Sequence, residues 1–522
     1  MATTTRAVPP WPSSRPCLCL ARVRHGHHRS CPRLRQPSIA LWFPSQGEAM
    51  ERPPDGQLQH FLFVTSPLQG HVNPVLRLAA HVTVANPSVH VTFSNAVSGH
   101  RRMFPTLASP DAEVADGVLH IPYSDGYDEG FDPKVHDVGS FNARARAVGG
   151  ETLSGIIERL AARGRPVTRV VYTFLVGWVL YVARTHGIPA AHYWIQPATV
   201  FAVYYHHFHG HGAVIASCAN DPSRGGSVKL PGLPPLNSDA LPSIVSVTSP
   251  DQPLYPALSA LRGLFSALGE QRPKVLVNTF EALELDALRA VPQLEVLAVG
   301  PVMPGSSATS NADLIKHGDV AEYMEWLDTK AARSVVYVSF GTMLPMSKHQ
   351  ELELTRGLEA TNRGYLWARG GAERSGDHDG TDGGSTGAQQ EREQGMVVDW
   401  CDQALVLSHH AVGCFVTHCG WNSALESITH GVPIVAVPQW TDQPTVAWLV
   451  EERAGVGVRA AIGGEGVVGR DELRRCVEAV MGEGEQAVEI RGQAKQWMEK
   501  AREAVSGGGT SEKNIRAFTS GL

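Results

Sequence analysis

The stretch GCFVTHCGWNSALESITHGVPIVAVPQ, residues 413–439, combines the patterns of a strand, a sharp turn, a helix and a second strand. An apolar run ends at Thr417, residues 418–420 supply the turn, and a helical pattern begins near residues 421–423. Near-continuous apolar strands joined through a helix are typical of parallel sheets that are covered on both faces. The stretch therefore predicts an α/β fold.

The same alternation occurs in two series along the chain. Apolar, β-rich runs separated by helical patterns occupy residues 60–67, 89–96, 167–174 and 190–197, and then 335–341, 365–369, 413–420, 433–439 and 455–460. A linker rich in Pro, Gly and Ser, residues 300–310, separates the two series. We therefore expect two α/β sheets, followed by a helical region from Asp471 in which Asp471 and Ser511 act as helix caps.

Composition excludes several classes of function. The net charge of the 522 residues is −6, and the excess of Arg in residues 1–49 leaves the rest of the chain at −12, so neither nucleic acid nor an anionic membrane is an expected partner. The longest apolar run, residues 170–183, has 14 residues, fewer than the roughly 20 that span a bilayer. Eight Cys are too sparse for a disulfide framework, which favours a reducing compartment.

Residues 1–49 form a leader with seven Arg and a single acid. This composition is typical of an organellar transit peptide, but the leader has little amphipathic periodicity. The alternative is an over-extended reading frame whose true start is Met50. We treat the leader as dispensable or mis-annotated, and we expect a cytoplasmic protein, or a plastid protein if the leader is a genuine transit peptide.

Polar side chains suited to a nucleotide lie at the start of the predicted helix in the opening stretch. His418, Asn422 and Ser423 follow a strand there, where amide donors and the positive end of the helix dipole bind diphosphates. Glu426 lies one turn further along the same face, where its carboxylate can accept hydrogen bonds from two ribose hydroxyls. The spacing therefore predicts a nucleotide site.

Two further pairs lie within the same 44 residues. Trp400 can stack on a nucleobase while Gln403 contacts its edge, and Asp442 with Gln443 can bind the hydroxyls of a hexose. Taken singly, each feature has a simpler interpretation, because a lone Trp is usually a core residue and a Thr-Asp-Gln turn is usually a helix cap. It is the combination that favours a nucleotide-sugar.

The block from Trp400 to Gln443 resembles the signature box of plant-type UDP-dependent glycosyltransferases of family 1, which have the GT-B fold. One departure is Asp402, where the family usually has Pro, and we expect this acid to weaken donor binding slightly. The resemblance implies UDP-sugar contacts from Gly341, Thr342, Trp400, Cys401, Gln403, His418, Gly420, Trp421, Asn422, Ser423, Glu426, Trp440, Asp442 and Gln443. The terminal Gln443 implies UDP-glucose as the donor.

A second signature, SPLQGHVNP at residues 66–74, directly follows the first predicted strand. Its His71 is suited to accept a proton from the acceptor, because an imidazole is half-neutral near pH 7. Many relatives orient this His with an Asp, and Thr173 stands at that position here. A hydroxyl cannot stabilise an imidazolium as a carboxylate does, so we expect weaker base catalysis and an acceptor that ionises easily.

Four other motifs are weighed against simpler readings. Residues 377–379 (DHD) could bind a metal and residues 383–387 match G-x-S-x-G, but both fall in a low-complexity polar tract. Residues 464–469 match the G-x-G-x-x-G of an NAD-dependent oxidoreductase, yet lack the acid that should follow. The cluster of His206, His207, His209 and His211 more often lines a pocket or faces solvent than binds a metal.

The patterns and the resemblance together predict a domain organisation and a reaction. We expect two Rossmann-like domains that face a cleft, residues 50–303 binding the acceptor and residues 304–505 binding the UDP-sugar, with residues 506–522 returning as a helix to the first domain. The expected reaction is metal-independent, inverting transfer of glucose to a small hydrophobic carboxylate or phenol by a monomer without a cofactor. The alternatives are a non-catalytic nucleotide-sugar binder and, less favoured, an NAD-dependent oxidoreductase.

Overall fold

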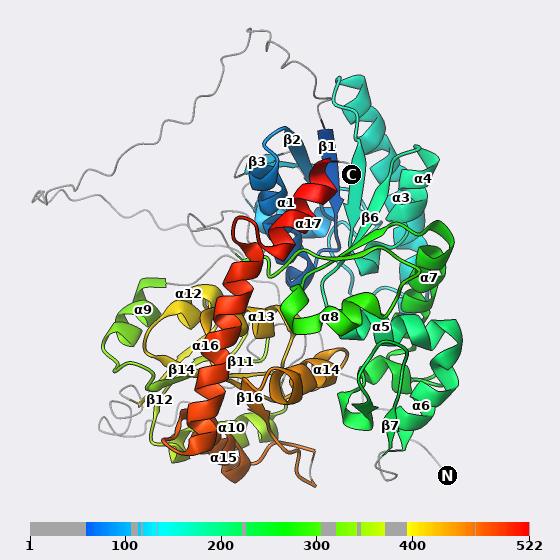
Figure 1. Ribbon diagram of the computed structural model, residues 1–522. Helices are drawn as coiled ribbons and strands as arrows, with labels where there is room; N and C mark the ends of the chain where they lie inside the picture. Colours follow the sequence, from blue (N-terminus) through cyan, green and yellow to red (C-terminus); the bar gives the residue numbers. More distant parts are fainter. Residues whose placement is uncertain are drawn as a thin grey trace, which may run out of the picture. The chain divides into compact units, whose positions relative to one another are not determined.

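The computed structural model (Figure 1) describes residues 59–105, 113–115, 118–132, 134–221, 226–303, 320–341, 346–370, 394–464 and 466–520. Within this part of the chain there are two large sheets and one short hairpin. The leader at 1–49, Thr342 and the motifs at 377–379 and 383–387 lie outside the described residues.

The first sheet has eight strands in the order β10-β9-β6-β5-β1-β2-β4-β3. All neighbours pair in parallel except β3 and β4. The strands are β1 (Gln59–Val64), β2 (Val89–Ser94), β3 (Glu113–Ala115), β4 (Val118–His120), β5 (Arg169–Tyr172), β6 (Ala190–Trp194), β9 (Lys274–Val277) and β10 (Val296–Ala298). The hairpin pairs β7 (Ser227–Val228) with β8 (Leu236–Asn237).

Helices connect the strands of this first sheet. They are α1 (Gln69–Ala85), α2 (Val97–Met103), α3 (Val138–Ala162), α4 (Val179–Thr185), α5 (Ala198–His206), α6 (Gly212–Asn220), α7 (Tyr255–Gln271) and α8 (Glu281–Arg289). Alternate residues of β1 enter separate cores on the two faces of the sheet: Leu62 and Val64 on one, Phe61 and Phe63 on the other. This two-sided burial explains the uninterrupted apolar run.

The second sheet has six strands, all parallel, in the order β13-β12-β11-β14-β15-β16. They are β11 (Val335–Ser339), β12 (Gly364–Ala368), β13 (Gly395–Val398), β14 (Val412–Thr417), β15 (Ile434–Ala436) and β16 (Gly457–Arg459). Its helices are α9 (Val320–Asp328), α10 (Lys348–Ala360), α12 (Gln403–Ser408), α13 (Trp421–His430) and α14 (Gln443–Trp448). The α/β expectation with two parallel sheets is confirmed.

The C-terminal region is helical as expected, but it is broken into α15 (Arg470–Met481), α16 (Glu485–Val505) and α17 (Thr510–Ser520). Both expected caps are wrong: Gly469 is the N-cap of α15, and Ser511 lies inside α17. Ser511 instead donates to the carbonyl of Gly300 at 2.6 Å, and α17 packs against α1 and β10 of the first sheet. Figure 1 shows this return path in red.

Candidate active site

His71 and Thr173 meet because β1 and β5 are neighbours in the first sheet. Val64 of β1 pairs with Tyr172 of β5, so the segments that follow these two strands emerge at the same edge. His71 lies in the first turn of α1, and its Nδ1 is 3.3 Å from Oγ1 of Thr173. Thr65 in turn places its own Oγ1 3.1 Å from the Thr173 hydroxyl.

The imidazole of His71 is kept neutral by its surroundings. Its side chain is buried, and this burial lowers the pKa of His71 to about 3. When Nδ1 donates its proton to Thr173, Nε2 carries a bare lone pair, and that nitrogen has no hydrogen-bond partner within the described part of the chain. The geometry therefore leaves a neutral ring whose Nε2 is unpaired among the described residues.

A row of aromatic rings extends from His71 through the elements that surround the first sheet. The ring of His71 lies 4.9 Å from that of Phe174, which lies 5.5 Å from Trp194. Trp194 contacts Phe201 at 5.3 Å, and Phe201 contacts Phe265 at 5.2 Å. The sequence analysis missed this row, although Phe174 directly follows Thr173. It gives the surroundings of His71 an apolar, aromatic character that suits a hydrophobic acceptor.

The turn before α13 depends on two glycines that make room for His418. A Cβ on Gly420 would lie 2.6 Å from Nε2 of His418, and a Cβ on Gly341 would lie 3.0 Å from its Cε1. Gly341 and Cys419 both have positive φ angles, +74° and +62°. Burial lowers the pKa of His418 to about 4, so a neutral ring stands beside the start of the helix.

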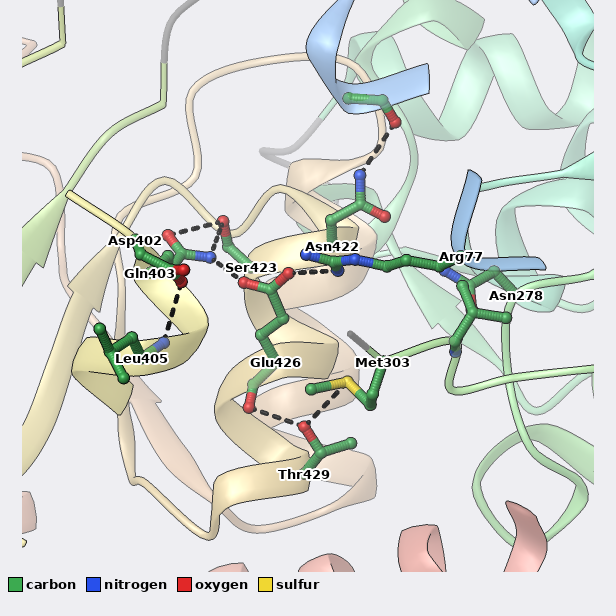
Figure 2. A network of polar contacts seen from close by, with 12 residues as sticks. Arg77, Asn278, Met303, Asp402, Gln403, Leu405, Asn422, Ser423, Glu426 and Thr429 are labelled. Atoms are coloured by element: carbon green, nitrogen blue, oxygen red, sulfur yellow. Dashed lines mark hydrogen bonds and ion pairs between the residues drawn. The ribbon is translucent and has the colours of Figure 1, made fainter. Parts of the chain in front are cut away.

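Glu426 is the centre of a polar network on α13 (Figure 2). Its Oε2 accepts a hydrogen bond from Nε2 of Gln403 at 2.7 Å, and the same nitrogen is 3.1 Å from Oγ of Ser423. Its Oε1 accepts from Nη1 of Arg77 at 2.6 Å. The structure therefore brings three of the sequence-predicted residues together and adds Arg77, which lies on α1 and carried no signal in the sequence.

Two residues at the start of α13 contact the first half of the chain. Asn422 donates from Nδ2 to the carbonyl of Gly70 at 2.9 Å, one residue before His71. Trp421 is 3% exposed and donates from Nε1 to the carbonyl of Asn278 at 2.7 Å. Because its indole nitrogen has a protein partner, a sugar contact from Trp421 would have to come from its other atoms.

The segment after β15 holds Asp442 and Gln443 in a tight turn. The amide oxygen of Gln443 accepts from the backbone N–H of Gln439 at 2.8 Å and of Trp440 at 3.1 Å, which closes the turn before α14. Asp442 is the N-cap of α14, but its side chain makes no capping hydrogen bond, in contrast to the helix-cap interpretation. Asp442 accepts from the hydroxyl of Thr441 at 2.9 Å, and burial raises its pKa to about 6. The Gln443 amide nitrogen and the Asp442 carboxylate are the groups left for a ligand.

The segment between β13 and α12 carries Trp400, Cys401 and Asp402. Trp400 is half-buried, whereas Cys401 is buried with its Sγ 3.3 Å from the hydroxyl of Tyr337. Burial raises the pKa of the Cys401 thiol to about 12, so the side chain stays neutral and serves packing, and a donor contact from Cys401 would have to come from its backbone. The carboxylate of Asp402 caps α12 by accepting from the N–H of Leu405 at 3.0 Å, a local role for the departure from the family pattern.

Comparison with known proteins decides the family. The family described as UDP-glucoronosyl and UDP-glucosyl transferase matches residues 263–485. UDP-glycosyltransferase 75C1 of Solanum lycopersicum is 42% identical over 88% of this chain and 97% of its own length, and a chloroplastic crocetin glucosyltransferase of Gardenia jasminoides is 40% identical over the same shares. This chain is a plant family 1 UDP-glycosyltransferase. As a member, the enzyme is a hexosyltransferase that uses a UDP-sugar as its donor substrate.

The fold of this UDP-glycosyltransferase is likewise shared with solved structures. The crystal structure of Os79 from O. sativa in complex with UDP is 30% identical, with a TM-score of 0.75, over 89% of this chain and 100% of that chain. The two parallel sheets are therefore the two Rossmann-like halves of a GT-B enzyme. Membership in this family excludes the less favoured alternative, an NAD-dependent oxidoreductase built on residues 464–469. In the structure Gly463 and Gly466 instead form a tight turn there.

The histidine cluster of the glycosyltransferase lies where α5 passes into α6. The helix is interrupted at His209 and Gly210, and Nδ1 of His209 is 2.7 Å from the carbonyl of Tyr205. His207 and His209 line a surface cavity of about 480 Å³ with Arg262. Among the described residues, no three His, Cys, Asp or Glu side chains are grouped so as to hold a metal ion. Nor does any described helix have the length and apolar character of a membrane span.

Proposed function

We propose that this enzyme transfers glucose from UDP-glucose to a small hydrophobic acceptor, with inversion and without a metal ion. The observation that carries the proposal is the hydrogen bond from Asn422 to Gly70. It places the start of α13, the expected diphosphate site, one residue away from the neutral His71. This contact supports the proposal, because a single displacement requires the base and the leaving-group site to be neighbours.

The two substrates are proposed to bind to different halves of the chain. We assign the acceptor to residues 50–303 and the UDP-sugar to residues 304–505, with residues 506–522 joining the first half. The proposed donor contacts are Gly341, Thr342, Trp400, Cys401, Gln403, His418, Gly420, Trp421, Asn422, Ser423, Glu426, Trp440, Asp442 and Gln443. We also propose a monomer in the cytoplasm, with the plastid as the alternative if residues 1–49 are a transit peptide.

We propose that the glucose is transferred in a single displacement at the anomeric carbon. Nε2 of His71 takes the proton of the acceptor hydroxyl, and the acceptor oxygen forms a bond to the anomeric carbon from the face opposite the diphosphate. The bond between that carbon and the phosphate oxygen breaks, and UDP leaves with the electron pair. The N-terminus of α13 and the side chain of His418 stabilise the charge that develops on the phosphate. The product is a β-glucoside or a β-glucose ester.

Thr173 shapes the acceptor preference. Its hydroxyl orients Nδ1 of His71 at 3.3 Å but supplies no negative charge for the imidazolium. Burial, which lowers the pKa of His71 to about 3, opposes protonation as well. A carboxylic acid needs little help, because it is already ionised at neutral pH. We therefore propose that carboxylates, which give glucose esters, are the better acceptors.

An acceptor comparison tests this proposal. Purified enzyme with UDP-glucose and EDTA should glucosylate aromatic carboxylates faster than phenols of similar size, as measured by mass spectrometry of the products. The EDTA also tests independence from metal ions, since strong inhibition would revive the motif at residues 377–379. If UDP is released with none of the acceptors, the non-catalytic binder becomes the better interpretation.

The substitution Thr173→Asp should raise phenol turnover by about tenfold, because a carboxylate beside Nδ1 stabilises the imidazolium that forms in the reaction. Turnover of a carboxylic acid should change much less, since that acceptor has no proton to give up. Steady-state kinetics with one phenol and one carboxylate of similar shape measure both effects. Thr173→Ser is the matched control, because it keeps a hydroxyl. An unaltered phenol rate in Thr173→Asp contradicts the argument.

A further inference from the structure

Arg77 comes from the first half of the chain but ends at a side chain of the second. It lies in the middle of α1, its side chain is 20% exposed, and its Nη1 is 2.6 Å from Oε1 of Glu426. The two residues are 349 positions apart in the sequence. Figure 2 shows Arg77 and Gln403 reaching the carboxylate of Glu426 from opposite sides.

The Glu426 carboxylate is thereby fixed in orientation. Its side chain is only 8% exposed, and each of its oxygens accepts one hydrogen bond, from Arg77 or from Gln403. A carboxylate oxygen has two lone pairs, so each oxygen retains the capacity to accept one further hydroxyl. The pair of free positions matches the two hydroxyls of a ribose.

The position of Arg77 on α1 follows from helix periodicity. Gly70 and Arg77 are seven residues apart and share one face of α1, whereas Asn422 and Glu426 are four residues apart and share one face of α13. The contacts Gly70–Asn422 and Arg77–Glu426 therefore run along the same pair of facing helices. A nearly buried carboxylate without a counter-charge is costly, and the facing helix supplies that charge.

We propose that Arg77 is a positioning residue of the donor site, which holds and neutralises Glu426 so that its carboxylate can bind the ribose of the UDP-sugar. This inference rests on the proposed donor role of Glu426. Because Arg77 belongs to the acceptor half, the donor site is complete only when α1 and α13 face each other. Donor affinity is therefore coupled to the association of the two halves.

Replacement of Arg77 by methionine tests the inference. Arg77→Met should raise the Kd of UDP and the KM of UDP-glucose by about tenfold, the usual cost of one charge-assisted hydrogen bond, while kcat at saturating donor changes by less than about twofold. Arg77→Lys keeps the charge without the planar fork and should recover part of the affinity. Titration calorimetry and steady-state kinetics give these values, and circular dichroism checks that each variant is folded.

A matched control distinguishes the positioning of Glu426 by Arg77 from a general effect of ion pairs that link the two halves of the chain. Arg453 forms an ion pair with Asp286 at 2.8 Å, which links α8 to the segment after α14. Among the described residues, no hydrogen bond or ion pair joins either of them to a proposed donor side chain. Arg453→Met should leave the Kd of UDP unchanged. An equal loss in Arg77→Met and Arg453→Met, or no loss in Arg77→Met, overturns the inference.

The same measurements distinguish this inference from the proposed function. If Glu426→Gln weakens UDP binding and Arg77→Met does not, only the positioning role fails. If neither variant affects UDP binding, the donor assignment of Glu426 fails as well. If Arg77→Met weakens binding and Arg77→Lys recovers part of it, the positioning role stands.

Discussion

His71→Ala is expected to lower kcat for phenol glucosylation by about 10²- to 10⁴-fold, the usual contribution of a general base. The reason lies in the surroundings of the imidazole. Nδ1 faces the Thr173 hydroxyl at 3.3 Å, the ring packs on Phe174, and Nε2 is left as the proton acceptor.

Binding of UDP should survive this substitution. The described contacts of the His71 side chain are with Thr173 and Phe174, whereas the proposed donor contacts lie in the second half. The Kd of UDP, measured by calorimetry, should therefore stay within about twofold. His71→Gln is the control that keeps hydrogen-bonding capacity but not basicity. Equal losses of turnover and of UDP affinity would remove His71 from the role of base.

The pH dependence gives a second check on His71. Because burial lowers its pKa to about 3, the ring is neutral, and so competent as a base, at every pH above that value. The rate constant kcat/KM should thus show no rise between pH 6 and 7 of the kind that an ordinary histidine, with a pKa near 6.5, would cause. A rise of kcat/KM in that pH range would mean that the His71 imidazole is more exposed to solvent than the structure shows.

The parts of the fold predicted from sequence are those that depend on local chain chemistry. The apolar runs of β1 and β14 are buried on both faces, and the glycines around His418 fit a turn that admits no Cβ. Strands β9 and β10 were missed, because short runs such as KVLV and VLA become strands only through pairing with neighbours. The cap formed by Asp402 could have been found, since an acid directly before a helix is a known signal.

The contacts of the site that could not be predicted from the sequence are those between residues far apart in the chain. Arg77 reaches Glu426 only because α1 and α13 face each other, and no spacing in the sequence encodes that contact. The burial of Trp421 against Asn278 has the same origin. Local motifs therefore gave the candidate residues of each sheet, whereas the contacts between Arg77 and Glu426 and between Trp421 and Asn278 required the fold.

Glu426→Gln is expected to raise the Kd of UDP by about 100-fold. Two ribose hydroxyls that bind an ionised carboxylate make charge-assisted hydrogen bonds, and their replacement by weaker contacts to an amide costs roughly 1.4 kcal/mol each. The substitution also removes the negative charge that pairs with Arg77 at 2.6 Å. Calorimetry with UDP measures the loss. Glu478→Gln is the matched control, because Glu478 is 65% exposed and pairs with Arg363 away from the site.

Together, Glu426→Gln and His71→Ala distinguish the residues that bind the donor from the residue that acts in the chemical step. Glu426→Gln should keep most of kcat once UDP-glucose is saturating, because the proposed partner of the carboxylate is the ribose and not the anomeric carbon. His71→Ala should show the reverse, with donor affinity intact and turnover lost. Such a split is expected only if the base and the ribose site are separate groups that meet through the contact of Asn422 with Gly70. If Glu426→Gln lowered kcat as strongly as it raised KM, Glu426 would lie too close to the reacting carbon for a ribose contact.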